Sequence, residues 1–255
     1  MWKLILLDLD GTLLCTDKTV SGYTLDVLER CRAKGCKVAI CTARGASNAE
    51  KYIARVKPDF VVSSGGALVL AGKETVYCSL FSAEETARMI ETALALTNGG
   101  EITVDTLTRH YWNYKIDPHS AAMGWGDTVH TDYRDFREPS LKICVQTTEE
   151  AVARAVAESV PGCDWARFSD GDWFKFSKDT ATKEHAIAAI SAATGITPAE
   201  MIAFGDDYVD IGMLELCGCG VAMGNAIEAV RRAADDITET NDADGVAKYL
   251  ERRLL

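Results

Sequence analysis

The sequence predicts an α/β fold with a parallel sheet at its core and a smaller α+β domain inserted into it. Three observations support this prediction. Strand-like and helix-like segments alternate in the first third of the chain and again in the last third. Between them, strand-like segments follow one another and carry many β-branched and aromatic residues. The length of 255 residues is enough for one large domain or two modest ones.

The first third of the chain supplies the first alternating series. Residues 3–8 are apolar enough for a strand that is covered on both faces, as in parallel sheets. A helix near 21–34 follows, with Gly35 as its C-terminal cap. The series continues with a strand at 37–41, a helix near 46–56 and a strand at 60–63. This order predicts parallel strands joined by helical crossovers.

The middle third has a different pattern. Ser82 and Glu85 form a capping box that opens a helix to about residue 97. Thr147 and Glu150 form a second capping box, for a helix to about residue 159. Strands are expected at 101–107, 110–117 and 141–146, and a hairpin at 164–169 and 172–177 with Asp170-Gly171 at its turn. This order is α+β, which predicts a separate inserted domain.

The alternation returns in the last third. A helix is expected at 181–194, ending at Gly195, and residues 197–200 (Thr-Pro-Ala-Glu) carry the signals of a brief helical turn. The remaining elements are strands at 201–204 and 220–223, a helix opened by the pair Asn225 and Glu228, and a C-terminal helix at about 244–254. We therefore expect a discontinuous core of residues 1–81 plus 182–255, with residues 82–181 as the inserted domain.

The charge balance limits the classes of function. Lys and Arg number 27 against 38 Asp and Glu, a formal net charge of -11, so no basic footprint suggests nucleic acid or an anionic membrane. An anionic substrate must therefore meet a local positive charge or a bound cation. No apolar run approaches the roughly 20 residues of a membrane span. The N-terminus lacks the small-residue cleavage site of a secretory signal, and we expect a cytoplasmic protein.

The nine cysteines are expected to be free thiols. Their odd number argues against a complete disulfide framework, and no Cys or His pair at zinc spacing accompanies the close pair Cys217 and Cys219. Five of the nine lie in apolar periodic segments, where a free cysteine acts as a small hydrophobic residue: Cys31, Cys36, Cys41, Cys144 and Cys217.

Polar side chains follow the ends of several core strands. Asp8 and Asp10 end the first strand, where side chains two residues apart project to the same face. The other groups are Thr42 and Arg44 after the second strand, Lys183 at the start of a helix, and Asp206, Asp207 and Asp210 just past a later strand. In open α/β sheets, ligands bind in the crevice beyond these strand ends.

Such a group of residues suits phosphoryl transfer. Converging carboxylates raise one another's pKa, and Mg²⁺ relieves this because it binds a few carboxylates while keeping waters for a substrate phosphate. An aspartate can act as the nucleophile and form an aspartyl-phosphate. Positioning and charge neutralisation by metal, lysine and hydroxyl groups supply the rest. Taken alone, Asp8 and Asp10 also fit a strand that simply ends in an Asp/Gly turn.

The motifs resemble those of haloacid dehalogenase superfamily phosphatases, in particular the Cof-type branch (subfamily IIB, with a C2-type cap after the third core strand). "DLDGTLL" resembles the first motif, "CTAR" the second, "TKEHAI" the third, and "FGDDYVDIGML" with "GVAMGNA" the fourth. The resemblance spans essentially the whole chain. It implies a Rossmann-like core with an inserted cap, and a Mg²⁺-dependent phosphatase of small phosphorylated metabolites, with sugar phosphates favoured.

The resemblance also implies a role for each motif residue. Asp8 would attack phosphorus, and Asp10 would protonate the leaving oxygen and then activate the hydrolytic water. Thr42 would bind a phosphoryl oxygen, and Lys183 would neutralise charge on Asp8 and on the phosphate. The metal ligands would be the Asp8 carboxylate, the Asp10 backbone carbonyl, Asp206 and, mostly through water or toward Lys183, Asp210.

Four positions depart from the motifs of the family. Val209 stands where an asparagine is usual, Asp207 adds a negative charge, Ala43 replaces a glycine, and Gly65 stands where an asparagine is expected. These departures bear on substrate placement and rate. Asp207 is expected to be solvated or to lie behind the ligands, and for Arg44 two roles stay open, an ion pair or a phosphate contact.

The inserted segment offers secondary candidates for substrate specificity. They are aromatic and lysine side chains on predicted strands, although aromatic residues that alternate along a strand more often pack. These candidates are Trp112, Tyr114, Lys115, Trp173 and Lys175. The stretch 127–138, "DTVHTDYRDFRE", is expected to be a solvated loop.

Two other functions use the same residues. A phosphometabolite sensor or interaction module with little turnover is supported only by the altered fourth motif. Asp10 argues against it, because a pure binder has no need of a group that handles protons. A phosphotransferase would need a second acceptor, and the sequence specifies none.

Overall fold

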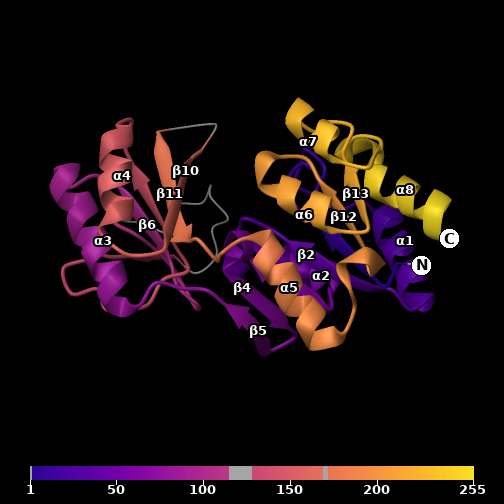
Figure 1. The fold of residues 1–255 in the computed structure, drawn as a ribbon, viewed down its shortest axis with the longest axis horizontal. Helices are drawn as coiled ribbons and strands as arrows, with labels where there is room; N and C mark the ends of the chain where they lie inside the picture. Colours follow the sequence, from indigo (N-terminus) through magenta and orange to yellow (C-terminus); the bar gives the residue numbers. More distant parts are fainter. Residues whose placement is uncertain (1, 115–127, 169–171) are drawn as a thin grey trace. The chain divides into compact units, whose positions relative to one another are not determined.

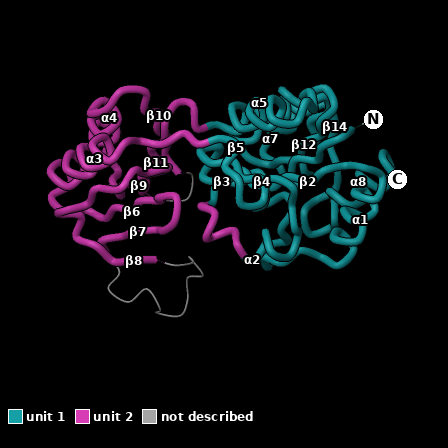
Figure 2. Tube along the Cα trace, turned by 90° about the horizontal axis from the view of Figure 1, so that it is seen from below, with its two compact units in different colours: residues 1–44, 51–77, 182–255 teal, residues 45–50, 78–181 magenta. Residues whose placement is uncertain are grey.

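The chain forms two compact units, each with its own sheet (Figure 2). The computed structural model describes residues 2–114, 128–168 and 172–255. The first unit comprises residues 1–44, 51–77 and 182–255, and the second comprises residues 45–50 and 78–181. The described part of the chain contains no helix that is long and apolar enough to cross a membrane.

The first unit is built on an eight-stranded sheet in the order β14-β13-β12-β1-β2-β3-β4-β5 (Figure 1). The strands are β1 (Leu4–Leu7), β2 (Lys37–Cys41), β3 (Phe60–Ser63), β4 (Leu68–Ala71), β5 (Glu74–Cys78), β12 (Met201–Gly205), β13 (Cys219–Ala222) and β14 (Asp236–Ile237). The strands from β14 to β3 are parallel, which confirms the predicted sheet. The sequence reading missed β4, which pairs antiparallel with β3, and also β5 and β14.

The strand β1 lies in the middle of the parallel strands, and its four residues are fully buried. Its last residue, Leu7, pairs with Ile40 of β2 on one side and with Phe204 of β12 on the other. The three strands therefore end at nearly the same level. Asp8 and Thr42, which come directly after β1 and β2, stand at this shared edge.

Helices pack on this sheet, with α1 against α8 and α6 between α5 and α7. They are α1 (Gly22–Ala33), α5 (Lys183–Thr194), α6 (Ile211–Leu216), α7 (Glu228–Ala233) and α8 (Gly245–Leu254), with 3-10 turns η1 (Ser64–Gly66), η2 (Pro198–Glu200), η3 (Tyr208–Asp210) and η4 (Asn241–Ala243). Helix α2 (Ala46–Val56) is divided between the two units, after residue 50. Thr182 caps α5 by accepting the N–H of His185, and α5 ends at Gly195 with a φ of 72°. The helix predicted there is confirmed, although it starts two residues later.

The described part of the second unit has a six-stranded sheet in the order β10-β11-β9-β6-β7-β8, in which β7 and β8 pair in parallel and the other neighbours pair antiparallel. The elements are α3 (Ala83–Leu96), β6 (Ile102–Asp105), β7 (His110–Trp112), β8 (Thr128–His130), β9 (Lys142–Gln146), α4 (Glu150–Glu158), β10 (Cys163–Arg167) and β11 (Trp173–Lys178). Helix α3 begins with the predicted capping box of Ser82 and Glu85. The β10–β11 hairpin is also confirmed, and its turn at Asp170-Gly171 lies outside the described residues.

The prediction of a solvated loop at 127–138 is only partly correct. Residues 131–138 lie in no helix or strand, and Asp132, Arg134, Asp135 and Arg137 are exposed. Strand β8 lies within this stretch and pairs with β7. Tyr133 and Phe136 are buried in the apolar core of the second unit. Tyr133 also donates its hydroxyl to the carbonyl of Ile102. Charged residues surround these aromatic side chains in the sequence, so the composition of the stretch did not indicate that the two would pack in the core.

Two predicted capping boxes are also wrong. The residue before α4 is Glu149, and the Thr147 hydroxyl accepts the N–H of Glu149 instead of capping the helix. Helix α7 follows Ile227 without a side-chain cap. Asn225, the expected cap of α7, forms hydrogen bonds elsewhere in the first unit. Asn and Thr side chains can satisfy several backbone groups, so their spacing alone does not identify the partner.

The expectation for the cysteines is confirmed. All nine are free thiols. The five that were expected to act as small hydrophobic residues are buried: Cys31, Cys36, Cys41, Cys144 and Cys217.

Candidate active site

Two neighbouring parallel strands bring acidic groups to one edge of the first unit's sheet. Asp8 follows β1, and Asp206 follows β12. Asp210 ends η3, the short turn that comes after Asp206. Each of the three carboxylates offers an oxygen, and these oxygens all lie within 4.8 Å of one another. The structure thus brings together three of the candidates at the edge where α/β sheets bind ligands.

A buried lysine joins two of these carboxylates. The ammonium group of Lys183, at the first residue of α5, donates to Asp8 Oδ1 over 2.7 Å and to Asp210 Oδ1 over 2.5 Å. Lys183 is only 2% exposed. Burial alone would lower its pKa, but Asp210 and Asp8 outweigh burial and raise the pKa above its ordinary value. Lys183 is therefore held as a cation at this site.

Asp210 uses both of its oxygens within the protein. Oδ1 accepts the Lys183 ammonium, and Oδ2 accepts the backbone N–H groups of Asp206 over 2.9 Å and of Asp207 over 3.1 Å. The Asp210 side chain is fully buried. The arrangement fixes the turn after β12 and holds Lys183 in place. Asp210 is thus better suited to orienting the site than to binding a metal directly.

The other two carboxylates are suited to a hard cation. Burial raises the pKa of Asp8 well above its ordinary value, with Lys183 opposing the rise and Asp210 adding to it. Burial likewise raises the pKa of Asp206 to about 6. Both shifts mean that negative charge is unfavourable here without a compensating cation. An all-oxygen set of carboxylates is the donor set that Mg²⁺ prefers, so these residues fit that ion.

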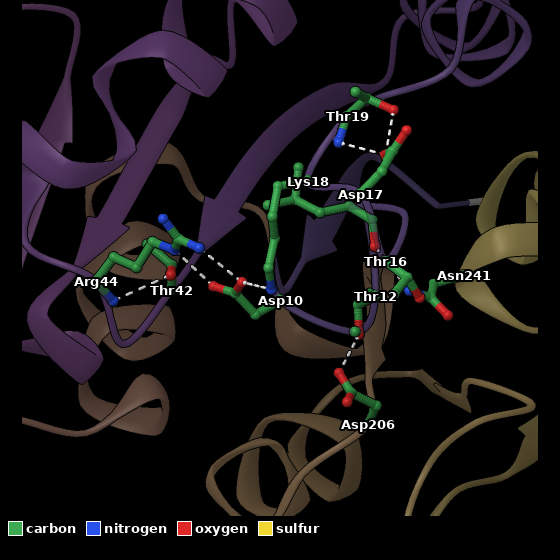
Figure 3. Close-up of polar contacts among 12 residues, drawn as sticks. Asp10, Thr12, Thr16, Asp17, Lys18, Thr19, Thr42, Arg44, Asp206 and Asn241 are labelled. Carbon is green, nitrogen blue, oxygen red and sulfur yellow. Dashed lines mark hydrogen bonds and ion pairs between the residues drawn. The ribbon is translucent and has the colours of Figure 1, made fainter. Parts of the chain in front are cut away.

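Thr12 orients the Asp206 carboxylate, a role that the sequence reading missed. The Thr12 hydroxyl donates to Asp206 Oδ1 over 2.7 Å, and Figure 3 shows the two side chains facing each other. The preceding residue, Gly11, lies so close that a Cβ there would collide with the Asp206 carboxylate. Gly11 also has a φ of 80°, which favours glycine. The Gly-Thr pair after Asp10 was the available signal, but its partner is 194 residues away in the sequence.

Asp10 is held between two cations (Figure 3). The guanidinium of Arg44 donates to both Asp10 oxygens, from Nε over 2.6 Å and from Nη2 over 2.7 Å. Lys18 donates to Oδ1 over 2.7 Å. Burial alone would raise the pKa of Asp10, but hydrogen bonds from Arg44 and Lys18 outweigh it and lower the pKa to about 2. Of the two roles left open for Arg44, the structure contains the ion pair.

The other motif residues lie around these two groups. Thr42 is buried, and its hydroxyl accepts the backbone N–H of Arg44 over 3.1 Å. The side chain of Asp207 is exposed and accepts the N–H of Tyr208, so it caps η3. Val209 is 48% exposed. The backbone bonds to Asp210 hold this turn without the usual asparagine.

Three candidates of the second unit, Trp112, Tyr114 and Trp173, form an aromatic row. Trp112 and Tyr114 have ring centroids 5.7 Å apart, and Tyr114 and Trp173 have centroids 5.6 Å apart. Trp112 is only 2% exposed, which indicates packing, whereas Tyr114, Trp173 and Lys175 are half-buried. Lys115 lies outside the described residues. A role of these residues in specificity stays a prediction.

Comparison with known proteins identifies the family. The model of the haloacid dehalogenase-like hydrolases matches residues 5–250, nearly the whole chain. The chain belongs to the haloacid dehalogenase-like hydrolases. The resemblance read from the four motifs is therefore confirmed, and so is the Rossmann-like core with an α+β insertion.

Related haloacid dehalogenase-like hydrolases include named phosphatases. The chain is 30% identical to the 5-amino-6-(5-phospho-D-ribitylamino)uracil phosphatase YitU of Bacillus subtilis, over 97% of this chain and 96% of that protein. A haloacid dehalogenase-like hydrolase from Bacteroides thetaiotaomicron has a TM-score of 0.85 at 28% identity, with 99% of each chain covered. The sugar phosphatase BT4131, of subclass IIB, has a TM-score of 0.81 at 26% identity, with 98% of each chain covered.

Proposed function

We propose that this haloacid dehalogenase-like hydrolase is a Mg²⁺-dependent phosphatase of small phosphorylated metabolites, with sugar phosphates as the favoured class. The observation that carries the proposal is the buried Lys183, which is bonded to both Asp8 and Asp210 beside Asp206. A nucleophile, a buried cation and a set of metal ligands are the parts that phosphoryl transfer requires. The related phosphatases support the same reaction class.

In the first half-reaction, an oxygen of Asp8 forms a bond to phosphorus while the bond from phosphorus to the leaving oxygen breaks. The product is an aspartyl-phosphate on Asp8 and an alcohol that has taken a proton from Asp10. Lys183 neutralises charge on Asp8 and on the phosphoryl oxygens. Thr42 donates its hydroxyl to one of these oxygens, as its place after β2 supports.

In the second half-reaction, Asp10 takes a proton from water, and the water oxygen attacks the phosphorus of the aspartyl-phosphate. The bond between phosphorus and the Asp8 oxygen breaks, which releases phosphate and restores the Asp8 carboxylate. Arg44 and Lys18 favour the ionised form of Asp10, the form that can accept this proton. To donate a proton in the first half-reaction, Asp10 must loosen its bonds to these two cations.

The residues that would hold Mg²⁺ are Asp8 and Asp206 through their carboxylates and Asp10 through its backbone carbonyl. Asp210 would contribute through water, because both of its oxygens are already bonded. When bound, Mg²⁺ supplies positive charge that neutralises the phosphoryl oxygens and the carboxylate cluster. Thr12 keeps the Asp206 carboxylate in one orientation for this role.

Residues 82–181 are proposed to act as a cap domain that selects the substrate. The relatives differ in substrate: one is named for a ribitylaminouracil phosphate and another for sugar phosphates. Specificity therefore varies on a shared scaffold, and the metabolite is not set by the family. Tyr114, Trp173 and Lys175 stay the candidates for contacts with the organic part of the substrate.

Removal of metal is the direct test of the proposed function. Phosphate release would be measured on a panel of sugar phosphates, nucleotides and an aryl phosphate, with Mg²⁺ and with excess chelator. We expect release to be lost in chelator and restored by added Mg²⁺, because charge in the carboxylate cluster is then uncompensated. Release that persists in chelator would contradict the proposed metal dependence.

The same panel tests the sensor alternative. Binding of a phosphorylated compound without release of phosphate would favour a sensor or interaction module. Transfer of the phosphoryl group to an added alcohol instead of to water would favour a phosphotransferase. The altered fourth motif supports the sensor only weakly, because Asp210 still holds the backbone of the turn that carries Val209.

Mg²⁺ binding is expected to weaken as the pH falls through about 6. The pKa of Asp206 is raised to about 6, and below that pH a proton occupies the carboxylate that the metal needs. We expect the apparent dissociation constant for Mg²⁺ to rise by up to about tenfold for each pH unit below that value. Titration calorimetry at several pH values measures this, and a constant affinity from about pH 7 to pH 5 would contradict it.

The metal-free protein should show the opposite trend in stability. The folded pKa of Asp206, about 6, exceeds its ordinary value of 3.8, so the folded state keeps a proton that the unfolded state has released. The contribution of the Asp206 carboxyl group to the free energy of unfolding is therefore complete below pH 3.8 and is lost as the pH rises through about 6. Added Mg²⁺ should reverse this loss near neutral pH.

A further inference from the structure

Side chains from a late part of the chain hold the loop of residues 11–16. The Asn225 amide donates from Nδ2 to the Gly11 carbonyl over 2.8 Å, and its Oδ1 accepts the backbone N–H of Asn241 over 3.0 Å. The Asn241 side chain donates in turn from Nδ2 to the Leu14 carbonyl over 2.8 Å. Two asparagines thus link to each other and to two carbonyls of this loop.

Asp242 adds a third point of attachment. Its two carboxylate oxygens accept the N–H and the hydroxyl of Thr16, each over 2.7 Å. Figure 3 shows Asn241 close to Thr16. We refer to Asn225, Asn241 and Asp242 as the loop anchor. Its contacts join positions that are 214 to 227 residues apart, so the conformation of the loop depends on tertiary contacts.

The loop held in this way carries the group that orients Asp206. The Gly11 carbonyl, which Asn225 binds, belongs to the peptide group that leads into Thr12. The Thr12 hydroxyl is 2.7 Å from Asp206 Oδ1. The Gly11 backbone packs directly against the same carboxylate. A shift of this peptide by a few tenths of an ångström would therefore lengthen the hydrogen bond or press on Asp206.

We propose that the loop anchor positions the metal site: Asn225, supported by Asn241 and Asp242, fixes the Gly11–Thr12 peptide so that the Thr12 hydroxyl orients the Asp206 carboxylate for Mg²⁺. The proposal rests on the proposed function, because it concerns the same metal site. It makes Asn225 a positioning residue, which binds the Gly11 carbonyl and acts on Asp206 through Thr12. Groups that orient metal ligands typically change metal affinity by about 10- to 100-fold when they are removed.

The hydrogen bonds of the loop anchor are expected to contribute little to the stability of the fold. Asn225 and Asp242 are exposed residues. Hydrogen bonds at such positions add about 1 kcal/mol or less each to the free energy of unfolding. Their substitution is therefore expected to leave the protein folded. Without Asn225, however, the orientation of the Gly11 carbonyl is no longer held by this hydrogen bond.

The test measures Mg²⁺ affinity by titration calorimetry on the resting protein, without substrate. The variants are Asn225→Ala, Thr12→Val and the two combined. Thr12→Ser keeps the hydroxyl and should restore the affinity. Thr19→Ala is the matched control, because Thr19 follows the loop closely in the chain and its hydroxyl donates to Asp17 instead of to the loop anchor. The melting temperature of each variant shows whether it is folded.

We expect Asn225→Ala to raise the Mg²⁺ dissociation constant by about tenfold, and Thr19→Ala to leave it unchanged. If Asn225 acts through Thr12, the combined variant binds Mg²⁺ no more weakly than Thr12→Val alone. Multiplied effects in the combined variant, or wild-type affinity in folded Asn225→Ala, would overturn the proposal.

Two further results separate this inference from the proposed function. A wild-type protein that binds no Mg²⁺ would refute the metal site itself, and with it the proposed function. A wild type that binds Mg²⁺, with all variants equal to it, would refute only the role of the anchor. Should Asn225→Ala fail to fold, Asn241→Ala, which frees the Leu14 carbonyl, is expected to give the same loss of affinity.

Discussion

Asp8→Asn is expected to reduce phosphate release by at least about 10⁴-fold while leaving the protein folded. The asparagine has nearly the same size, and its oxygen can still accept the Lys183 ammonium that now lies 2.7 Å from Asp8 Oδ1. It lacks the negative charge that attacks phosphorus, so no aspartyl-phosphate forms. Steady-state and single-turnover release of phosphate measure the loss.

The stability of this variant gives an independent readout. Burial raises the pKa of Asp8, so its charged form is unfavourable in the folded, metal-free protein. A neutral asparagine removes that penalty, and the melting temperature without metal should equal or exceed that of the wild type. Asp26→Asn, on the exposed surface of α1, is the control and should retain full activity. Comparable activity of Asp8→Asn and wild type would refute the aspartyl-phosphate mechanism.

Most residues of the candidate site could be predicted because the ends of the core strands can be identified from the sequence. The apolar runs of β1, β2 and β12 are unambiguous, and parallel strands bring their carboxyl ends to one edge. Asp8 and Asp206 could therefore be placed together although they lie far apart in the chain. Lys183 could be placed near the start of a predicted helix, although that helix begins two residues later than predicted.

Contacts that join distant residues explain what could not be predicted. Asn225 and Glu228 have the spacing of a helix cap, yet the Asn225 amide binds the Gly11 carbonyl. The same side chain can cap a helix locally or bind a distant backbone group, and the sequence alone does not show which of the two bonds forms. The bond from Thr12 to Asp206 escaped prediction for the same reason, since nothing near Thr12 indicates its partner.

The part of the stretch 127–138 that was predicted wrongly has a related cause. Its net polarity suggested solvent, but burial there is decided by two aromatic side chains, Tyr133 and Phe136, that reach the core of the second unit. Pairing of β8 with β7 fixes that stretch against the sheet. Composition averages over a segment, whereas packing acts on single side chains.

Lys183→Met is expected to lower the free energy of unfolding by about 3–5 kcal/mol near neutral pH. The side chains of Lys183 and Asp210 are each only 1% exposed, and that of Asp8 is 9% exposed. Methionine fills a similar volume but leaves two buried carboxylates without their cation. Phosphate release should also fall by about 10²- to 10³-fold, because a charge that stabilises the transition state is lost.

The loss of stability should depend on pH in a defined direction. Without the ammonium, the folded pKa of Asp8 rises further above its ordinary value of 3.8. A raised carboxyl pKa contributes stability that is complete below the unfolded value and is lost as the pH rises through the folded one. The deficit of Lys183→Met relative to wild type is therefore smallest near about pH 4 and grows toward neutral pH. Urea unfolding of the metal-free proteins at several pH values measures it.

A matched substitution tests whether the loss of stability depends on the buried position of Lys183 or follows from the loss of any lysine. Lys37→Met removes an exposed ion pair with Asp59, whose atoms lie 3.3 Å apart, and should cost about 1 kcal/mol or less. Added Mg²⁺ should recover part of the stability of Lys183→Met, because the metal binds only the folded site. A deficit no larger than that of Lys37→Met, or one that is independent of pH, would show that Lys183 does not compensate buried negative charge. With the predicted deficit, the ammonium group is what limits the rise in the pKa of Asp8 and so favours the ionised form that attacks phosphorus.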